Sequence, residues 1–316
     1  MHNTKSLFGS DSAQFIDIID QLALAKSKAK YSFMALDDYK HILHEESDLG
    51  MQVYWSEIIA RAHLTAVVAI LRSRHWISAV VTATNDNNLL AFAAAFRGLI
   101  ESSADTQSAL GGIAVSLAEN HVNISRALSG KLSNQWFVSK DIEDALIHFK
   151  YARHLTKSEM ATAPQTHKAL QVRQYIEGLE KGQVHNVTAC YQSLCDLTHP
   201  GASSVWMWIT SENGVDFELN PNQDESTIAS YLTEYRDTFS ELLMFAFNSA
   251  VITLNMLNYL PLKKYHTPNL LDWNLSGIPL WQKCQSKLGD CLPIARKDKG
   301  LRLVKSKPAV HTDDAR

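Results

Sequence analysis

Helical periodicity runs through almost the whole chain, and one segment, residues 88–110, is apolar on nearly every side of the helix that it predicts. Its large apolar side chains are Leu89, Leu90, Phe92, Phe96, Leu99 and Ile100. A helix that is apolar all round is stable in water only when other elements surround it. We therefore predict an all-α fold, a multi-helix bundle with this segment near its centre.

Other helices are predicted around this segment from the spacing of apolar residues and from capping residues. We expect breaks at Gly50 and at Gly111-Gly112, and a stop and restart at Asn85 to Asn88. Residues 75–84 either continue the helix before them or begin a new one. The predicted helices are 12–28, 36–47, 52–74, 113–129, 140–155, 166–180, 183–198 and 224–258.

One β-hairpin is predicted at about residues 204–219, inserted into the helical pattern. Apolar residues alternate with others on both sides of Asn213-Gly214, and this dipeptide favours a tight turn. Past Pro261 the chain has scattered prolines and no long period, so we expect extended structure there. The predicted organisation is an N-terminal helical segment (1–48), a bundle core carrying the hairpin (49–260), and an extended C-terminal segment with a basic tail (261–316).

Residues 242–260 form a stretch of nineteen residues without a formal charge. That length is close to what spans a bilayer. The stretch contains Asn248, Asn255 and Asn258, and an asparagine side chain is costly in hydrocarbon without a partner. We therefore predict a buried central helix and no membrane association.

The formal net charge of −3 conceals an asymmetry between the body and the tail. Residues 296–307 hold six basic residues and one acid, a charge of +5 that leaves −8 for the rest. The body is therefore not a basic nucleic-acid-binding surface. The tail is either a solvated segment or an electrostatic arm, and Lys297, Arg302 and Lys305 are then candidates to bind RNA or an acidic partner.

The cysteine pattern and the N-terminus bear on the compartment. Cys190 and Cys195, and Cys284 and Cys291, are spaced in a way that fits paired zinc ligands poorly. The first fifteen residues lack the basic and apolar regions of a signal peptide. We predict a cytoplasmic protein with reduced thiols and no cofactor.

Two short motifs carry the candidate chemistry. The first is Arg97-x3-Glu101, with Asp105 one turn further, inside the apolar central helix. The four-residue step places these groups on one helix face. They are either a partly buried ion pair tied to a neighbouring helix, or a phosphate or carboxylate site in which Glu101 orients the guanidinium of Arg97.

The second motif is Tyr191-x3-Cys195-x3-His199 at the end of the predicted helix 183–198. A histidine at this position is either a C-terminal capping group or a general acid or base, because histidine titrates near neutral pH. Tyr191 and Cys195 lie on the same face, and Cys195 is expected to be a small core residue.

Metal chemistry is a further alternative, although we predict no metal site. Asp196-x2-His199 has a spacing used in metal-binding bundles, but no matching Glu-x2-His occurs in the chain. His41-x2-His44-Glu45-Glu46 is a second possible ligand cluster, better explained as a solvated helix face. Phosphate-binding loops, dinucleotide fingerprints, serine elbows and His-Glu-x2-His are all missing from the sequence.

The arrangement of Arg-x3-Glu on a central helix and Tyr-x7-His-Pro on a later one resembles an uncharacterised bacterial helical family related to the HEPN superfamily. The resemblance covers roughly residues 50–258. It implies a HEPN-like helical bundle that forms a homodimer. Many HEPN proteins are metal-independent RNases of toxin–antitoxin or antiviral defence systems, and others only bind partners.

This chain departs from the active members, in which one helix carries Arg-x4–6-His. Leu194, Ser193 and Gln192 stand where that arginine would precede His199. The resemblance then implies a bacterial defence or stress protein in which His199, Arg97, Glu101 and Tyr191 cleave or bind RNA. The alternative is a non-catalytic scaffold or antitoxin-like subunit that meets a protein partner encoded nearby, and a bundle metalloenzyme using Asp196 and His199 is a third.

Overall fold

The computed structural model describes residues 3–26, 28–199, 201–210, 213–220 and 222–295. The described residues form thirteen α-helices, four 3-10 helices and one pair of short strands, which confirms the predicted all-α bundle with a small hairpin. The α-helices are α1 (Thr4–Phe8), α2 (Ser10–Lys26), α3 (Leu36–Glu45), α4 (Ser47–Asn85), α5 (Leu89–Glu119), α6 (His121–Leu128), α7 (Lys140–Tyr151), α8 (Val172–Lys181), α9 (Val187–Thr198), α10 (Ala202–Trp206), α11 (Gln223–Glu234), α12 (Arg236–Leu257) and α13 (Pro279–Leu288). The remaining elements are β1 (Ile209–Thr210), β2 (Glu218–Leu219), η1 (Glu159–Ala161), η2 (Gln165–His167), η3 (Lys263–Tyr265) and η4 (Pro268–Asp272).

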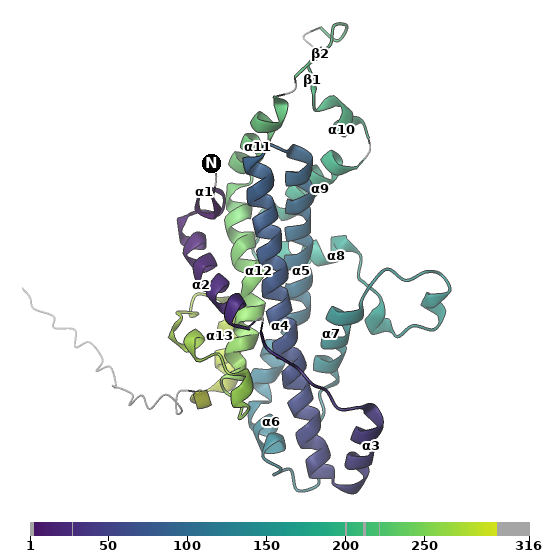
Figure 1. Ribbon diagram of the computed structural model, residues 1–316, viewed down its shortest axis with the longest axis vertical. Coiled ribbons are helices and arrows are strands. Elements are labelled where there is room, and N and C mark those ends of the chain that lie inside the picture. Colours follow the sequence, from purple (N-terminus) through teal and green to yellow (C-terminus); the bar gives the residue numbers. More distant parts are fainter. Residues whose placement is uncertain (1–2, 27, 200, 211–212, 221, 296–316) are drawn as a thin grey trace, which may run out of the picture.

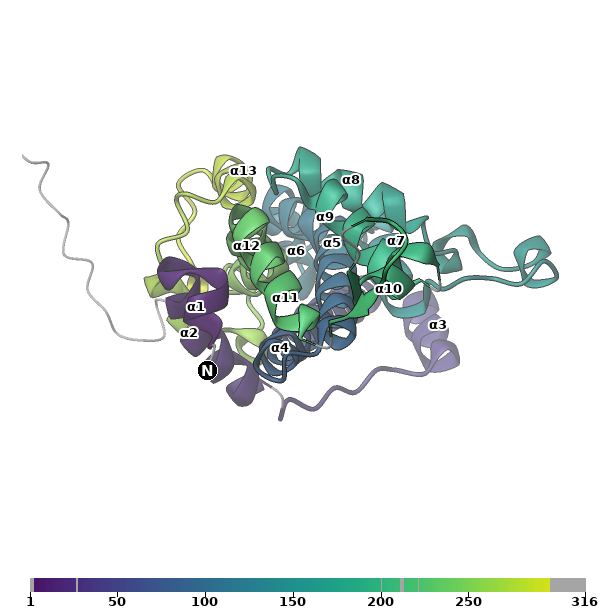
Figure 2. The ribbon, with the colours of Figure 1, turned by 90° about the horizontal axis from the view of Figure 1, so that it is seen from above.

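Three long helices, α4, α5 and α12, run side by side along the length of the molecule (Figure 1). Viewed from above, α1, α2 and α13 lie on one side of them, and α7, α8 and α9 on the other (Figure 2). Aromatic rings join two of the three helices, since Phe96 of α5 stacks on Phe239 of α12 with centroids 3.9 Å apart. The predicted central segment is therefore central in the fold, because most of the apolar side chains of α5 are buried against these neighbours.

The turn between α4 and α5 follows the predicted stop and restart. Helix α4 ends at Asn85, and α5 begins at Leu89. Asn87 adopts a left-handed backbone with φ of 48°, and the side chain of Asn88 caps α5 by accepting a 2.9 Å bond from the N–H of Ala91. These asparagines allow the chain to reverse within three residues, so that α5 packs back along α4.

The glycines that were expected to break helices do not do so. Gly50 lies inside α4, which runs unbroken from residue 47 to 85 and includes 75–84. Gly111 and Gly112 lie inside α5, which continues to Glu119. A glycine weakens a helix by only about 1 kcal/mol, and packing of the helix face outweighs that cost.

Two other predictions at element level were wrong, and the hairpin, although present, is shorter than predicted. The predicted helix 224–258 is two helices, α11 and α12, with Tyr235 between them. The predicted hairpin begins later than residue 204, because 202–206 form α10 and only Ile209–Thr210 pairs with Glu218–Leu219. The segment after Pro261 is not simply extended, since it forms η3, η4 and α13. The tail from residue 296, with Lys297, Arg302 and Lys305, lies outside the described residues.

Helix α12 contains most of the uncharged stretch, and it is the most deeply buried long helix. By length and composition alone, α4 and α12 could each cross a membrane, and 44% and 72% of their apolar windows are buried inside this fold. Asn255 and Asn258 are buried and hydrogen-bonded to each other or to the segment after α12. Partners within the fold therefore satisfy the two asparagines at the end of this helix.

We expect Gly98→Ala and Gly112→Ala, both on α5, to have opposite effects on stability. A Cβ atom at residue 98 would lie 2.6 Å from the indole ring of Trp76, whereas one at residue 112 would meet nothing within 4 Å. Gly112→Ala should raise the free energy of unfolding by about 1 kcal/mol through helix propensity. Gly98→Ala should lower it by roughly 1 kcal/mol, because Trp76 must move. Urea unfolding of both variants checks this, and equal shifts would show that the approach of Trp76 is unimportant.

Candidate functional site

The two predicted motifs meet because α9 packs against α5. Tyr191, near the start of α9, contacts Glu101, while Thr198, at its end, contacts Arg97. Residue numbers therefore rise on α9 as they fall on α5, so the two helices run antiparallel. The four-residue spacing brings Arg97 and Glu101 of the first motif and Tyr191 of the second to the shared interface.

Four side chains form a closed polar cluster at this interface, which we call the α5–α9 clamp: Arg97, Glu101, Tyr191 and Thr198. The Tyr191 hydroxyl donates a 2.7 Å hydrogen bond to Oε1 of Glu101, and Nη2 of Arg97 lies 3.6 Å from the same oxygen. Nη1 of Arg97 donates to Oγ1 of Thr198 at 2.5 Å. The guanidinium carbon lies 5.5 Å from the centroid of the Tyr191 ring, in cation–π geometry.

The clamp occupies most of the groups that were predicted to bind substrate, although Nε of Arg97 is buried without a partner among the described residues. The side chains of Arg97 and Glu101 are 23% and 38% exposed, and each already has partners within the chain. Burial, together with the hydrogen bond to Glu101, raises the pKa of Tyr191 well above its usual range. Tyr191 is therefore a protonated donor at neutral pH, and the geometry fits an interhelical tie.

His199 is the predicted site residue that the structure leaves out of this cluster. It is the C-cap of α9, and its backbone N–H donates to the carbonyl of Cys195 at 2.9 Å. Its imidazole is exposed and makes no hydrogen bond, ion pair or ring contact with the residues that the structure describes. Arg97 is hydrogen-bonded to Thr198, the residue before His199. Among the described residues, no hydrogen bond joins Arg97 to the imidazole of His199 itself.

Asp105, one turn beyond Glu101, belongs to a different ion pair. Its Oδ2 accepts a 2.6 Å bond from Nη2 of Arg72 on α4, and the same nitrogen donates to the carbonyl of Ser102 and to Thr106. Sequence reasoning missed Arg72 and Thr198. Arg72 follows an apolar run and stands two residues before Arg74. Periodicity predicts the face of a helix but not which helix lies across from it.

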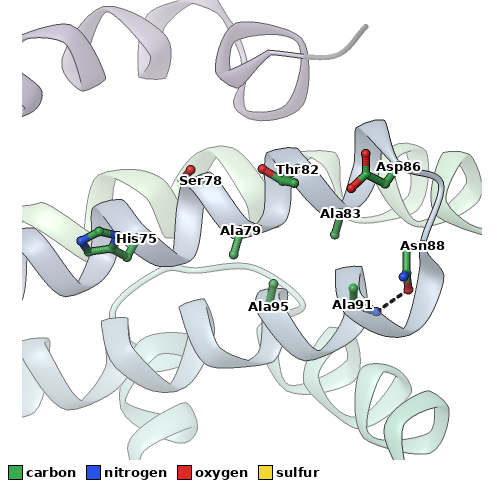
Figure 3. Close-up of a pocket in the computed structure, with 9 residues that line it drawn as sticks. All are labelled: His75, Ser78, Ala79, Thr82, Ala83, Asp86, Asn88, Ala91 and Ala95. Carbon is green, nitrogen blue, oxygen red and sulfur yellow. Dashed lines mark hydrogen bonds between the residues drawn. The ribbon is translucent and has the colours of Figure 1, made fainter.

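Two cavities in the described structure contain no clamp residue. The smaller, of about 390 Å³, lies between the end of α4 and the start of α5. Figure 3 shows Ala79 and Ala83 of α4 facing Ala91 and Ala95 of α5 across it. The four alanines carry no reactive group, and the other lining residues are polar: His75, Ser78, Thr82, Asp86 and Asn88. The larger cavity, of about 710 Å³, lies between α3, α4 and α7.

The metal alternatives gain no further ligands. Within the part of the chain that the structure describes, no three His, Cys, Asp or Glu side chains come together as a metal site would require. Neither Asp196 with His199 nor the cluster of His41, His44, Glu45 and Glu46 is part of such a site among the described residues. The four cysteines are free.

The chain around His199 is strongly acidic, which is a feature of its composition rather than of one motif. Residues 182–235 contain seven acidic residues and no lysine or arginine, a formal charge of −7 with histidines neutral. This stretch includes α9, α10, the hairpin and α11. An RNA phosphate approaching His199 would meet this charge without a compensating cation from the same segment.

Comparison of the chain with family models, with curated proteins and with solved structures finds no match.

We expect the clamp to contribute stability rather than catalysis. Arg97→Met removes a charge-assisted hydrogen bond and leaves Glu101 with one partner, so the free energy of unfolding should fall by about 1 to 2 kcal/mol after solvent screening. Tyr191→Phe should cost about 1 kcal/mol. The double variant should lose less than the sum of the two, because both side chains share Glu101. Additive losses in urea unfolding would contradict a shared cluster.

Proposed function

We propose that this protein is a non-catalytic helical interaction subunit, and that its arm, the described residues of 201–220, binds a basic partner protein. The observation that carries the proposal is an exposed apolar surface on a projecting segment without a single positive side chain. In a HEPN-like protein of bacterial defence or stress, such a subunit acts as a scaffold or an antitoxin-like component. The homodimer and the cytoplasmic location remain predictions.

Exposed apolar side chains gather on the arm, which extends beyond one end of the bundle (Figure 1). Five large apolar residues there are between 52% and 80% exposed, and the rings of two of them lie 5.4 Å apart. Clustered exposed aromatic and aliphatic groups are typical of protein-binding surfaces. The five are Val205, Trp206, Val215, Phe217 and Leu219.

The base of the arm is fixed even though its tip is exposed. Asp224 of α11 accepts a 2.7 Å bond from the indole N–H of Trp208 and a 3.2 Å bond from the N–H of Leu89 at the start of α5. The N–H of Asn220 donates to the carbonyl of Trp208 at 2.8 Å and closes the hairpin stem. The clamp fixes α9, which leads into the arm. A presented surface that is already ordered loses less entropy on binding.

The charge of the arm favours a basic partner. Asp216 and Glu218 alternate with the apolar residues of the second half of the hairpin, and both are exposed. Together with the acidic stretch 182–235, they attract lysine- and arginine-rich segments and repel nucleic acid. The partner chemistry that fits is an apolar surface bordered by basic residues.

The test uses a peptide of alternating lysine and leucine residues, with a glutamate–leucine peptide of the same length as its control. Binding is followed by tryptophan fluorescence in low and high salt. We expect the basic peptide to bind, and Phe217→Ser to weaken it at least tenfold without changing the melting temperature. The matched control is Val122→Ser, at an exposed valine of α6. The proposal would be refuted if the acidic peptide bound as tightly as the basic one, or if Phe217→Ser bound the basic peptide as tightly as the wild type.

One observation favours a second candidate, metal-independent RNA cleavage. Arg97 is hydrogen-bonded to Thr198, the residue before His199. The imidazole of His199 has no hydrogen-bond partner among the described residues, so a ribose hydroxyl could donate its proton to it. Labelled RNA is incubated with EDTA and the wild-type protein, His199→Ala or His44→Ala, the last at an exposed histidine of α3. The interaction proposal expects intact RNA in every case. Cleavage that is lost only in His199→Ala would establish the nuclease.

A further inference from the structure

We propose that the cavity between α3, α4 and α7 binds a small carboxylic acid with an apolar aliphatic or aromatic body. This cavity has a volume of about 710 Å³, which is within the range of sites for drug-sized ligands. It lies along the part of α4 between Val53 and Arg72. Figure 1 shows α3 beside α4 at the end of the bundle away from the arm, with α7 nearer the middle. The proposal is independent of the function proposed for the arm.

The walls of the cavity suit an apolar body. Aliphatic and aromatic side chains line most of it, among them Ile58 and Val68 of α4 and Leu146 and Phe149 of α7. Phe33, in the segment before α3, closes one side, and the guanidinium of Arg61 lies 4.2 Å from its ring centroid. Transfer of an apolar ligand from water into this cavity would be favourable, because its apolar surface leaves water.

Helix α3 forms the outer wall and is only lightly attached. None of its residues is buried, and Leu36, which faces the cavity, is 65% exposed. Its attachment to α4 depends on Gly50, where a Cβ atom would lie 2.6 Å from Cδ1 of Leu43 and 3.0 Å from its Cα. A ligand in the cavity would cover apolar surface on Leu36 and Tyr39 that the protein alone leaves partly open.

The acidic groups around the cavity already have partners. Glu57 accepts a 2.9 Å bond from Arg61 and a 2.6 Å bond from the N–H of Met34. Glu143 is hydrogen-bonded to the hydroxyl of Tyr54. Glu57 is therefore compensated by a cation, while Glu143 has one neutral donor, Tyr54.

The basic groups, in contrast, have unused donors. The ammonium of Lys150 lies 5.0 Å from the ring centroid of Tyr151 and has no carboxylate partner among the described residues. Arg72 pairs with Asp105 through Nη2, but its Nε is buried without an acceptor. With Arg61, the lining carries three positive and two negative side chains. The unmet hydrogen-bonding capacity is therefore that of donors, which a carboxylate headgroup satisfies.

The test compares three ligands with the same twelve-carbon body: dodecanoate, dodecanol and dodecylammonium, each below its micelle concentration. Binding is measured by calorimetry and by the shift in melting temperature, with 2-naphthoate as an aromatic acid of different shape. We expect an acid to bind at least tenfold more tightly than the alcohol and the ammonium. The proposal is wrong if neither acid binds, or if the ammonium binds as tightly.

Two variants locate the site. Lys150→Met keeps most of the length of the side chain. It should weaken binding of the acid at least tenfold and leave binding of the alcohol unchanged. Its control is Lys140→Met, at the exposed first residue of α7. Val68→Trp fills the cavity from a half-exposed position and should abolish binding of all ligands. Unchanged binding in Val68→Trp, with the fold intact by circular dichroism, would place the ligand elsewhere and overturn the proposal.

Discussion

Lowering the pH from 7.5 to 4.5 should reduce the free energy of unfolding by about 3 kcal/mol through one residue, His63 of α4. This imidazole is 1% exposed. Its Nδ1 shares a 2.6 Å hydrogen bond with the hydroxyl of Tyr31, and the ring of Tyr265 lies 5.2 Å away. Burial, with a smaller contribution from the charges of Lys26 and Lys264, lowers the pKa of His63 from 6.5 to about 3.

The sign of this effect follows from where the proton binds. The unfolded chain takes up a proton at His63 below about pH 6.5, whereas the folded protein does so only near pH 3. Between these values the unfolded state binds more protons, so stability falls as the pH falls. The contribution is complete above pH 6.5 and is lost progressively toward pH 3.

Urea unfolding at the two pH values measures the effect. His63→Asn keeps a hydrogen-bonding group near the position of Nδ1 but does not titrate, so its stability should depend less on pH by about 3 kcal/mol. His44→Gln, at an exposed histidine of α3, should retain the wild-type dependence. If His63→Asn and wild type change equally between the two pH values, another group is responsible.

Asn258→Leu should lower the free energy of unfolding by about 3 to 4 kcal/mol, the largest loss that we expect from a single substitution. Asn258 follows α12 and is fully buried. Its Oδ1 accepts from the N–H of Thr267 at 2.8 Å, and its Nδ2 donates to the carbonyl of Thr267 at 3.1 Å and to Oδ1 of Asn255 at 3.3 Å. Leucine fills the space but leaves the N–H of Thr267 buried without its acceptor, and Oδ1 of Asn255 loses its donor, whereas the carbonyl of Thr267 keeps a 3.0 Å bond from the N–H of Leu270.

Chemical denaturation tests this prediction, with Asn123→Leu as a control because Asn123 is exposed on α6. The backbone of Asn258 also accepts a bond from the N–H of Ala295 at 3.1 Å, so the residue ties two parts of the C-terminal segment to α12. Limited proteolysis of Asn258→Leu should therefore cut first between residues 262 and 295. A loss no larger than that of Asn123→Leu would show that water replaces these bonds.

Local signals in the sequence predicted the elements whose structure is decided locally. One helix ends at Asn85, and the side chain of Asn88 caps the next, so the turn could be predicted from these residues alone. Gly50 was wrongly predicted to break a helix. Its small size is instead needed because Leu43 of α3 packs directly against it. Helix α13 was missed because it is short, and Pro279 at its first turn is tolerated there as it would be in a loop.

The candidate site was predictable in part for the same reason. Spacing placed Arg97 and Glu101 on one face and Tyr191 on another, and these three residues do meet. The contact of Arg97 with Thr198 rather than His199 depends on the depth at which α9 packs, which no spacing encodes. The large cavity could not be predicted either, because its lining comes from three helices whose separation is decided by packing.

Because α4 is one unbroken helix, it fixes the distance between the cavity that it lines and the turn that leads into α5. Arg61 lines the cavity, and α4 ends at Asn85. Leu89, four residues later, begins α5 and is bonded to Asp224 at the base of the arm. At 1.5 Å of rise per residue, Arg61 and Asn85 are about 35 Å apart along a stiff rod. One small ligand cannot touch both positions, so the acid proposed for the cavity and the protein proposed for the arm would bind without steric conflict.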